Sequence, residues 1–244
     1  ITELASFCER NPGRGDEFVS GLPISADATN SGMQHYAAAS LDYDDGKLTN
    51  LVPQPELNDL YMACLARAKV LMAEKLDADT ASYEADPITP DEQAEIDAFE
   101  IFQDDESNSY DELKASRDEF KTTDAGKKMK LQRQIDAVTR ILGWEGYGRK
   151  VMKRNAMTFP YSSRRHGFAK QIFKDTMLPL SRKVRKGELD EHPFGKDQGF
   201  LAANIMAGIH EQAIKDTVQS AKTGMDFLQS CATALTNENK HFQF

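Results

Sequence analysis

The chain has 244 residues, 40% of them hydrophobic and 28% charged, which is enough apolar material for one sizeable core or two modest ones. It has no run of about 18 apolar residues that could span a bilayer, and its first residues lack the charged and apolar regions of a signal peptide. We therefore expect a soluble globular protein. The three cysteines, Cys8, Cys64 and Cys231, are widely spaced in helix-like patterns and predict buried, reduced thiols in a reducing compartment, with neither disulfides nor a zinc site.

The net charge of −9 conceals a strong partition along the chain. Residues 77–126 carry 17 acidic and 3 basic side chains, a net charge of −14. Residues 149–186 carry 12 basic side chains and one acidic side chain, a net charge of +11. The basic block is where a polyanion would bind, and the acidic block is predicted to be a solvated peripheral insert.

The first informative stretch is a predicted strand, turn and helix. Residues 22–27 alternate apolar and small side chains as in a short half-buried strand, and Asn30 or Ser31 is predicted to cap a helix over residues 31–41. Asp27 ends the strand, where a carboxylate is well placed to hold Mg²⁺. On its position alone, such an aspartate more often serves a turn or a cap.

Further helices follow in the first half of the chain. After an acidic turn at residues 42–46, Pro55 is predicted to open a long helix with apolar side chains at helical spacing up to Met72. The acidic block starts with a capping box at residues 89–92 and is predicted to form two or three surface helices, with a break at residues 107–109. Another amphipathic helix is expected over residues 127–142.

Residues 149–161 form the predicted central helix. At about 100° and 1.5 Å per residue, Arg149, Lys153 and Tyr161 share a face over roughly 18 Å, the scale of an extended nucleoside triphosphate. Cations in the first turns and an aromatic ring at the far end would seat phosphates and a base, respectively. The spacing alone favours an ordinary amphipathic core helix with a solvated basic face, so the functional interpretation depends on pairing this helix with Asp27.

The last part of the chain is also predicted to be helical. A short helix is expected over residues 168–178, with Pro179 and residues 187–195 in loops. A long helix is expected over residues 198–235, and residues 241–244 are expected to start a strand. The histidines share no metal-ligand spacing.

Three stretches resemble the single-subunit DNA-directed RNA polymerases of bacteriophages and mitochondria, which share a right-hand fold with family A DNA polymerases. LPISADATNSGMQH, residues 22–35, is similar to the first palm motif, and GKLTNLVPQPELNDLY, residues 46–61, to the segment after it. RKVMKRNAMTFPYSS, residues 149–163, is similar to the second motif, on the fingers helix. An arginine four residues before the lysine and a tyrosine eight after it are this family's fingers signature, and the chain keeps both.

The resemblance implies a mainly α, or α+β, fragment of the right-hand fold, with many helices and few short strands. Its expected organisation is a palm portion at residues 1–76, an acidic helical insert at 77–128, a fingers portion at 129–197, and a long helix returning to the palm at 198–244.

The resemblance also implies roles for individual residues. Asp27 would be one of two metal-binding aspartates, with the backbone carbonyl of Ala28 as a second contact. Arg149 and Lys153 would hold the triphosphate of the incoming nucleotide, and Lys153 would protonate the pyrophosphate leaving group. Tyr161 would pack at the sugar and base, where it would help to select ribonucleotides.

Three further expectations follow from the resemblance and from the basic block. Tyr61 would be a secondary contact near the template or substrate. Related DNA polymerases carry a glutamate that blocks the ribose 2′-hydroxyl five residues after the metal aspartate, and Gly32 at that position favours RNA synthesis. Neighbouring basic residues are expected to contact template phosphates, and these are Arg154, Arg164, Arg165 and Lys170.

The implied function is DNA-templated RNA synthesis by a monomeric enzyme, with two Mg²⁺ ions, template DNA, nascent RNA and ribonucleoside triphosphates as partners and no membrane. The second metal aspartate belongs to a later His-Asp motif, and no His-Asp pair follows Tyr161 in this sequence. The chain alone is therefore expected to be inactive. The parent protein is expected to be virus-encoded and to act in the host cytoplasm, with a mitochondrial enzyme as the alternative.

Some features depart from the family pattern. Ser162 and Ala28 stand where the family usually has glycine, and His166 stands in place of a common aromatic residue. Two alternatives stay open: a family A DNA polymerase fragment, and a non-catalytic helical nucleic-acid-binding protein, which would explain the basic block without Asp27.

Overall fold

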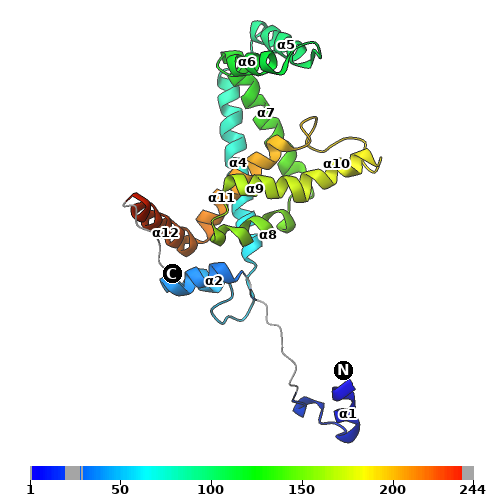
Figure 1. The fold of residues 1–244 in the computed structure, drawn as a ribbon, viewed down its shortest axis with the longest axis vertical. Coiled ribbons are helices and arrows are strands. Elements are labelled where there is room, and N and C mark those ends of the chain that lie inside the picture. The colour runs from blue at the N-terminus through cyan, green and yellow to red at the C-terminus, as the bar shows by residue number, and fades with distance from the viewer. Residues whose placement is uncertain (1, 20–27, 29, 238–244) are drawn as a thin grey trace.

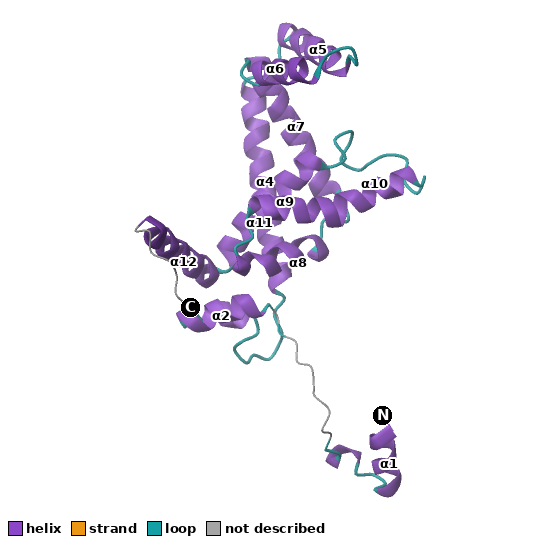
Figure 2. Ribbon diagram, in the orientation of Figure 1, coloured by secondary structure: helices purple, strands orange, loops and turns teal. Residues whose placement is uncertain are grey.

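The structure is a computed structural model that describes residues 2–19, 28 and 30–237, and every regular element in these ranges is a helix (Figures 1 and 2). The mainly helical fold class is thus confirmed. The predicted strands at residues 22–27 and 241–244 lie outside these ranges. None of the described helices is long and apolar enough to cross a membrane. The helices are α1 (Thr2–Arg10), α2 (Ser31–Ser40), α3 (Tyr43–Leu48), α4 (Leu60–Ala85), α5 (Pro90–Asp104), α6 (Tyr110–Phe120), α7 (Asp124–Gly143), α8 (Arg149–Thr158), α9 (Arg165–Ile172), α10 (Leu178–Arg185), α11 (Phe200–Thr217) and α12 (Gln219–Asn237), with 3₁₀ turns η1 (Gly15–Glu17) and η2 (Phe159–Tyr161) and the π-helical turn η3 (Phe173–Met177).

The main core lies where α4, α7, α8, α9 and α11 pack together (Figure 1). Its largest fully buried side chains include Phe159, Phe168, Met72, Met152 and Met206. Because these come from four different helices and from η2, burial of their apolar surface holds α8 against the rest of the body.

Helix α4 begins later than predicted, at Leu60 instead of Pro55. The Asp59 carboxylate accepts hydrogen bonds from the backbone N–H groups of Tyr61 and Met62, and this cap sets the first turn. The apolar stripe ends at Met72, but the helix continues to Ala85 and, alongside α7, reaches the far end of the molecule (Figure 1).

Helices α5 and α6 and the start of α7 form a separate small unit at that far end, the acidic tip, residues 86–126. Ile96, Phe120 and Ala125 make its own small core, and the rings of Phe99 and Phe120 stack with centroids 4.0 Å apart. The predicted capping box at residues 89–92 is present, and α6 starts with a second one at residues 109–112. The local capping signal at Thr89 therefore located α5 correctly, whereas the second box was not predicted.

The predicted single helix over residues 198–235 is wrong, because the chain breaks at Val218 between α11 and α12. Buried Asp45 causes the second start: its Oδ2 accepts hydrogen bonds from the backbone N–H, 2.7 Å away, and the hydroxyl of Ser220. Val218 itself has extended backbone angles and a fully buried side chain. A distant carboxylate thus caps a helix that the local sequence would continue.

Other local predictions also need correction. Pro179 is helical: it is the second residue of α10 and directly follows the π-helical turn η3, so that α9, η3 and α10 run on without the predicted break at Pro179. Residues 43–48 form α3, capped by Asp42, instead of the predicted turn. Cys64 is buried, and burial raises the pKa of its thiol to about 12, but Cys8 is exposed, contrary to prediction.

A buried polar chain links α8 to α9 and α11. His210 Nδ1 lies 2.7 Å from Asn155 Oδ1, and its Nε2 lies 3.2 Å from the Tyr147 hydroxyl. Asn155 Nδ2 donates to Gln171, whose amide nitrogen donates to the Thr158 hydroxyl. These partners fit a neutral imidazole that donates from Nδ1 and accepts at Nε2. Burial lowers the pKa of His210 to about 3.

We predict that this histidine makes folding sensitive to acid. An unfolded chain protonates histidine below about pH 6.5, whereas folded His210 stays neutral down to about pH 3, so its contribution to stability is complete above pH 6.5 and is lost as pH falls. Urea unfolding at pH 7 and pH 5 should show a loss about 2 kcal/mol larger in the wild type than in His210→Gln. Equal losses would contradict the assignment.

Candidate nucleotide-binding site

The N-terminal turns of α8 bring two cations over one aromatic ring. The Arg149 guanidinium lies 4.9 Å from the centroid of the Tyr61 ring, and the Lys153 ammonium lies 5.6 Å from it. Tyr61 is buried in the first turn of α4, so the two helices together place both charges. An anion approaching this end of α8 also meets the positive end of the helix dipole.

Asp59 completes this arrangement. Its Oδ2 lies 2.5 Å from Arg149 Nε. Burial alone would raise the pKa of Asp59, but hydrogen bonds from Arg149 and from the backbone of Met62 lower it, so the carboxylate stays charged at neutral pH. With side chains 46% and 38% exposed, the pair contributes at most about 1 kcal/mol to stability. Its main effect is therefore to fix where Arg149 points.

Helix α2 is anchored to the other end of α8. Asn30 caps α2 from a left-handed conformation, and its amide nitrogen donates to the carbonyl of Ala156, 3.0 Å away. A Cβ atom on Gly32 would lie 2.6 Å from Pro160 Cγ and 3.3 Å from Tyr161 Cζ. The start of α2, at Asn30 and Gly32, is thus in direct contact with the end of α8 and with η2.

The structure brings together only part of the predicted site. Arg149, Lys153 and Tyr61 form one cluster, and Gly32 with Tyr161 forms another, in which Tyr161 is 70% exposed. Tyr161 lies in η2, beyond the end of α8, so the predicted helix holds for Arg149 and Lys153 only.

The predicted metal ligand Asp27 lies outside the described residues, and its neighbour Ala28 is described. Within the described part, no group of three or more His, Cys, Asp or Glu side chains could hold a metal ion. A metal at this position therefore depends on Asp27 and on groups that the described chain does not bring there.

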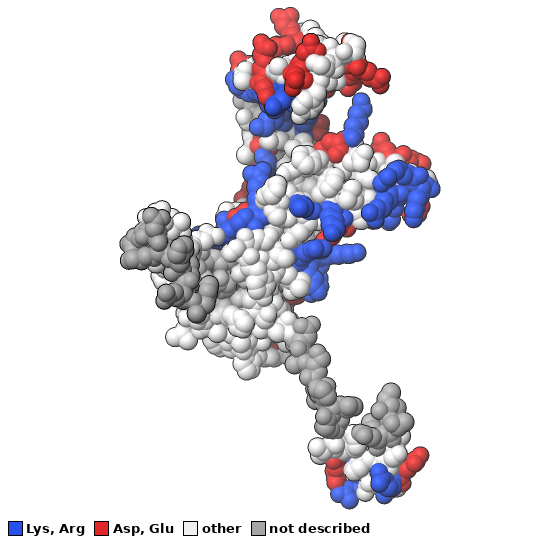
Figure 3. Space-filling model, viewed as in Figure 1, with Lys and Arg blue, Asp and Glu red and all other residues white. Residues whose placement is uncertain are grey.

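The four basic residues predicted to contact nucleic acid differ in how far they are already paired within the chain. Arg154 is paired with Asp175, and the backbone N–H of Arg165 donates to Glu211. Arg164 stacks on Phe159, and its Nη1 is buried without a hydrogen-bond partner in the described structure, which leaves a donor for an incoming acceptor. Lys170 has an exposed side chain. Figure 3 shows Lys and Arg gathered around α8 to α10.

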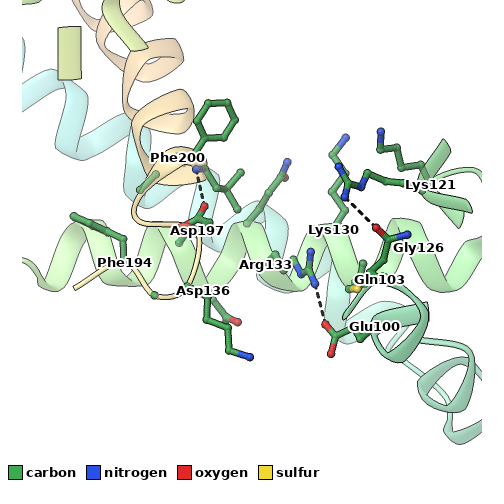
Figure 4. A pocket seen from close by; sticks show the side chains of 18 of the residues that line it. Glu100, Gln103, Lys121, Gly126, Lys130, Arg133, Asp136, Phe194, Asp197 and Phe200 are labelled. Carbon is green, nitrogen blue, oxygen red and sulfur yellow. Dashed lines mark hydrogen bonds and ion pairs between the residues drawn. The ribbon is translucent and has the colours of Figure 1, made fainter. Parts of the chain in front are cut away.

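A cavity of about 920 Å³ lies away from this site, between α5, α6, α7 and the segment before α11. Figure 4 shows Lys130 and Arg133 of α7 on one wall and Phe194, Asp197 and Phe200 on another. Arg133 is paired there with Glu100. None of the predicted site residues that the structure describes lines this cavity, so it is distinct from the cluster at Arg149, Lys153 and Tyr61.

Sequence reasoning missed the role of Asp59, and it predicted Asn30 as a helix cap but not its hydrogen bond to Ala156. An aspartate directly before an apolar helical run is a signal for an N-cap and could have located the start of α4. Its partnership with Arg149, 90 positions away, has no signal in the sequence.

Comparison with known proteins now decides the family. A sequence profile of the DNA-dependent RNA polymerase family matches residues 1–243. The chain belongs to this family.

Relatives of the chain come from bacteriophages. T7 RNA polymerase of Escherichia phage T7 is 28% identical over 240 residues, which cover 96% of this chain and 22% of that protein. The DNA-directed RNA polymerase of Enterobacteria phage T3 is also 28% identical over 240 residues, and that of Enterobacteria phage K11 is 26% identical over 242. The chain thus spans about a fifth of the length of these polymerases.

We predict that Gly32 is required by packing. Gly32→Ala would place a methyl group against the Pro160 ring, where the backbone must shift, at a cost of about 1–3 kcal/mol in unfolding free energy. Gly143→Ala is the matched control, because nothing lies within 4 Å of a Cβ there. Denaturant unfolding of both variants measures the difference, and equal stability would show that Gly32 is not needed for the contact.

Proposed function

We propose that this chain carries the incoming-nucleotide site of a DNA-templated RNA polymerase, whose parent protein adds ribonucleotides to the 3′-end of RNA. The observation that carries the proposal is the pair of cations, Arg149 and Lys153, held over Tyr61 at the N-terminal end of α8 in a chain of this family. In this proposal, residues 1–76 belong to the palm, 77–128 to an acidic insert, 129–197 to the fingers, and 198–244 return to the palm.

The proposed chemistry suits these residue types. Phosphoryl transfer is catalysed mainly by positioning and by neutralising charge on the transferring group. Arg149 binds and orients the triphosphate with its planar guanidinium, and Lys153, four residues further along the same face, carries a proton that can pass to the pyrophosphate leaving group. Tyr161 packs at the sugar and base, and the face of the Tyr61 ring contacts both cations.

Magnesium is the metal we propose, held by Asp27 and the Ala28 carbonyl and by a second aspartate from outside this chain, and it would neutralise charge on the transferring phosphate.

Template DNA runs past the basic residues after η2, where Arg164 offers an unpaired donor. Gly32 packs against Pro160 and Tyr161, and we propose, from the resemblance alone, that a glycine here in place of the glutamate of related DNA polymerases favours ribonucleotides. We further propose a monomeric, virus-encoded enzyme that acts in the host cytoplasm, with a mitochondrial enzyme as the alternative.

The test uses the full-length protein that contains this chain. Lys153→Ala should lower the rate of ribonucleotide addition on a primed DNA template by about a hundredfold, because a charge on the transferring group loses its partner. Lys150→Ala is the matched control: this lysine is exposed on the same helix but points about 60° away from Lys153 and about 100° away from Arg149. It should change the rate by less than about twofold.

Two results would contradict the proposal. Faster addition of deoxyribonucleotides than of ribonucleotides would favour the DNA polymerase alternative. Unchanged activity in Asp27→Asn would favour a non-catalytic nucleic-acid-binding protein.

A further inference from the structure

We propose that the outer face of α5, in the acidic tip, docks a basic amphipathic helix of a separate protein. This surface goes beyond the proposed polymerase function, because it contains none of the residues assigned to nucleotide, metal or template. It is an apolar stripe with an acidic border, on the side of α5 that faces away from the tip core.

Helix α5 has two apolar sides. Ile96 is buried in the tip core and Phe99 stacks on Phe120, which accounts for the inner side. At 100° per residue, four other apolar residues fall on the opposite side within an arc of about 100°, and they are Ala94, Ala98, Ile101 and Phe102. Ile101 is 72% and Phe102 37% exposed. A surface helix needs one apolar stripe for its own core, so the second stripe has no partner within the described structure.

Contacts at both ends of α5 hold this face in place. The capping box of Thr89 and Glu92 fixes the start of α5. Lys128 of α7 is largely buried and pairs with Glu92 and Asp86. At the other end, the Asn108 amide nitrogen donates to the carbonyl of Phe102, 2.9 Å away. A preformed face loses little conformational entropy when a partner binds.

The charges around the stripe favour a basic partner. By the same 100° rule, Glu95 borders one edge of the stripe, and Asp97 and Asp104 border the other. Asp91 and Asp105 lie at its two ends. Figure 3 shows the acidic residues over α5 and α6, and residues 77–126 carry a net charge of −14. This field repels nucleic acid and a second copy of the same surface, and it attracts a helix whose apolar stripe is bordered by Lys or Arg.

The acidic tip lies far from the cations of α8. The tip is at the far end of the α4 and α7 pair, whereas α2, α8 and α12 lie at the other end of the body (Figure 1). A protein held by α5 would therefore leave the cations of α8 accessible.

The test uses the 244-residue chain and a labelled synthetic helical peptide of leucine and lysine, with leucine at helical spacing. Fluorescence anisotropy at moderate salt should show saturable binding. The double variant Ile101→Ser, Phe102→Ser should weaken it about tenfold or more, because the apolar anchor is lost. Both side chains are exposed, and circular dichroism confirms that the variant folds. Phe227→Ser on α12, where the ring is 66% exposed, is the matched control and should leave the affinity unchanged.

Two peptides and one hydrodynamic measurement can overturn the proposal. A scrambled peptide of the same composition should bind about tenfold more weakly, and a leucine–glutamate peptide should not bind. Equal binding of the scrambled peptide, or no effect of the Ile101 and Phe102 substitutions, would show that the tip only attracts cations. Concentration-dependent dimers that the double variant abolishes would assign the face to a second copy of the chain.

Discussion

The ion pair between Asp59 and Arg149 is the constraint on which the candidate site depends. It joins the first turn of α4 to the first turn of α8 across 90 positions of sequence, and Tyr61 supports the same guanidinium from below. The pair is too exposed to add much stability, and the buried core of α4, α8 and α11 holds these helices together without it. Its effect is to hold the Arg149 guanidinium against Asp59 and over the Tyr61 ring, where the first turns of α4 and α8 meet.

The charge partition gives the molecule two ends with opposite tendencies. The basic block, residues 149–186, covers α8, α9 and α10 in the body, and most of the acidic block, residues 77–126, lies in a tip with a core of its own. A polyanion is therefore attracted to the end that carries Arg149 and Lys153 and repelled from the other. The overall charge of −9 averages over this separation and would mislead if taken as a measure of nucleic-acid binding.

Much of the fold and part of the site could be predicted from the sequence. The capping box at Thr89 and the apolar spacing up to Met72 are local signals, and the helices they predict are present, although α4 begins at Leu60 and not at the predicted Pro55. The break at Val218 could not be predicted, because the group that caps α12 is Asp45, 175 positions earlier. The same limit applies to the site: the spacing of Arg149 and Lys153 gave their shared face, but their common partner Tyr61 comes from another helix.

The interaction at the centre of this account can be tested by measuring tripolyphosphate binding to the 244-residue chain. Asp59→Asn keeps an N-cap for α4 but removes the negative charge 2.5 Å from Arg149, so the freed guanidinium should bind tripolyphosphate several-fold more tightly. Adding Arg149→Gln to that variant should abolish the gain. An affinity that does not rise in Asp59→Asn, or a gain that survives Arg149→Gln, would show that Arg149 is a structural partner of Asp59 and not a ligand for the triphosphate.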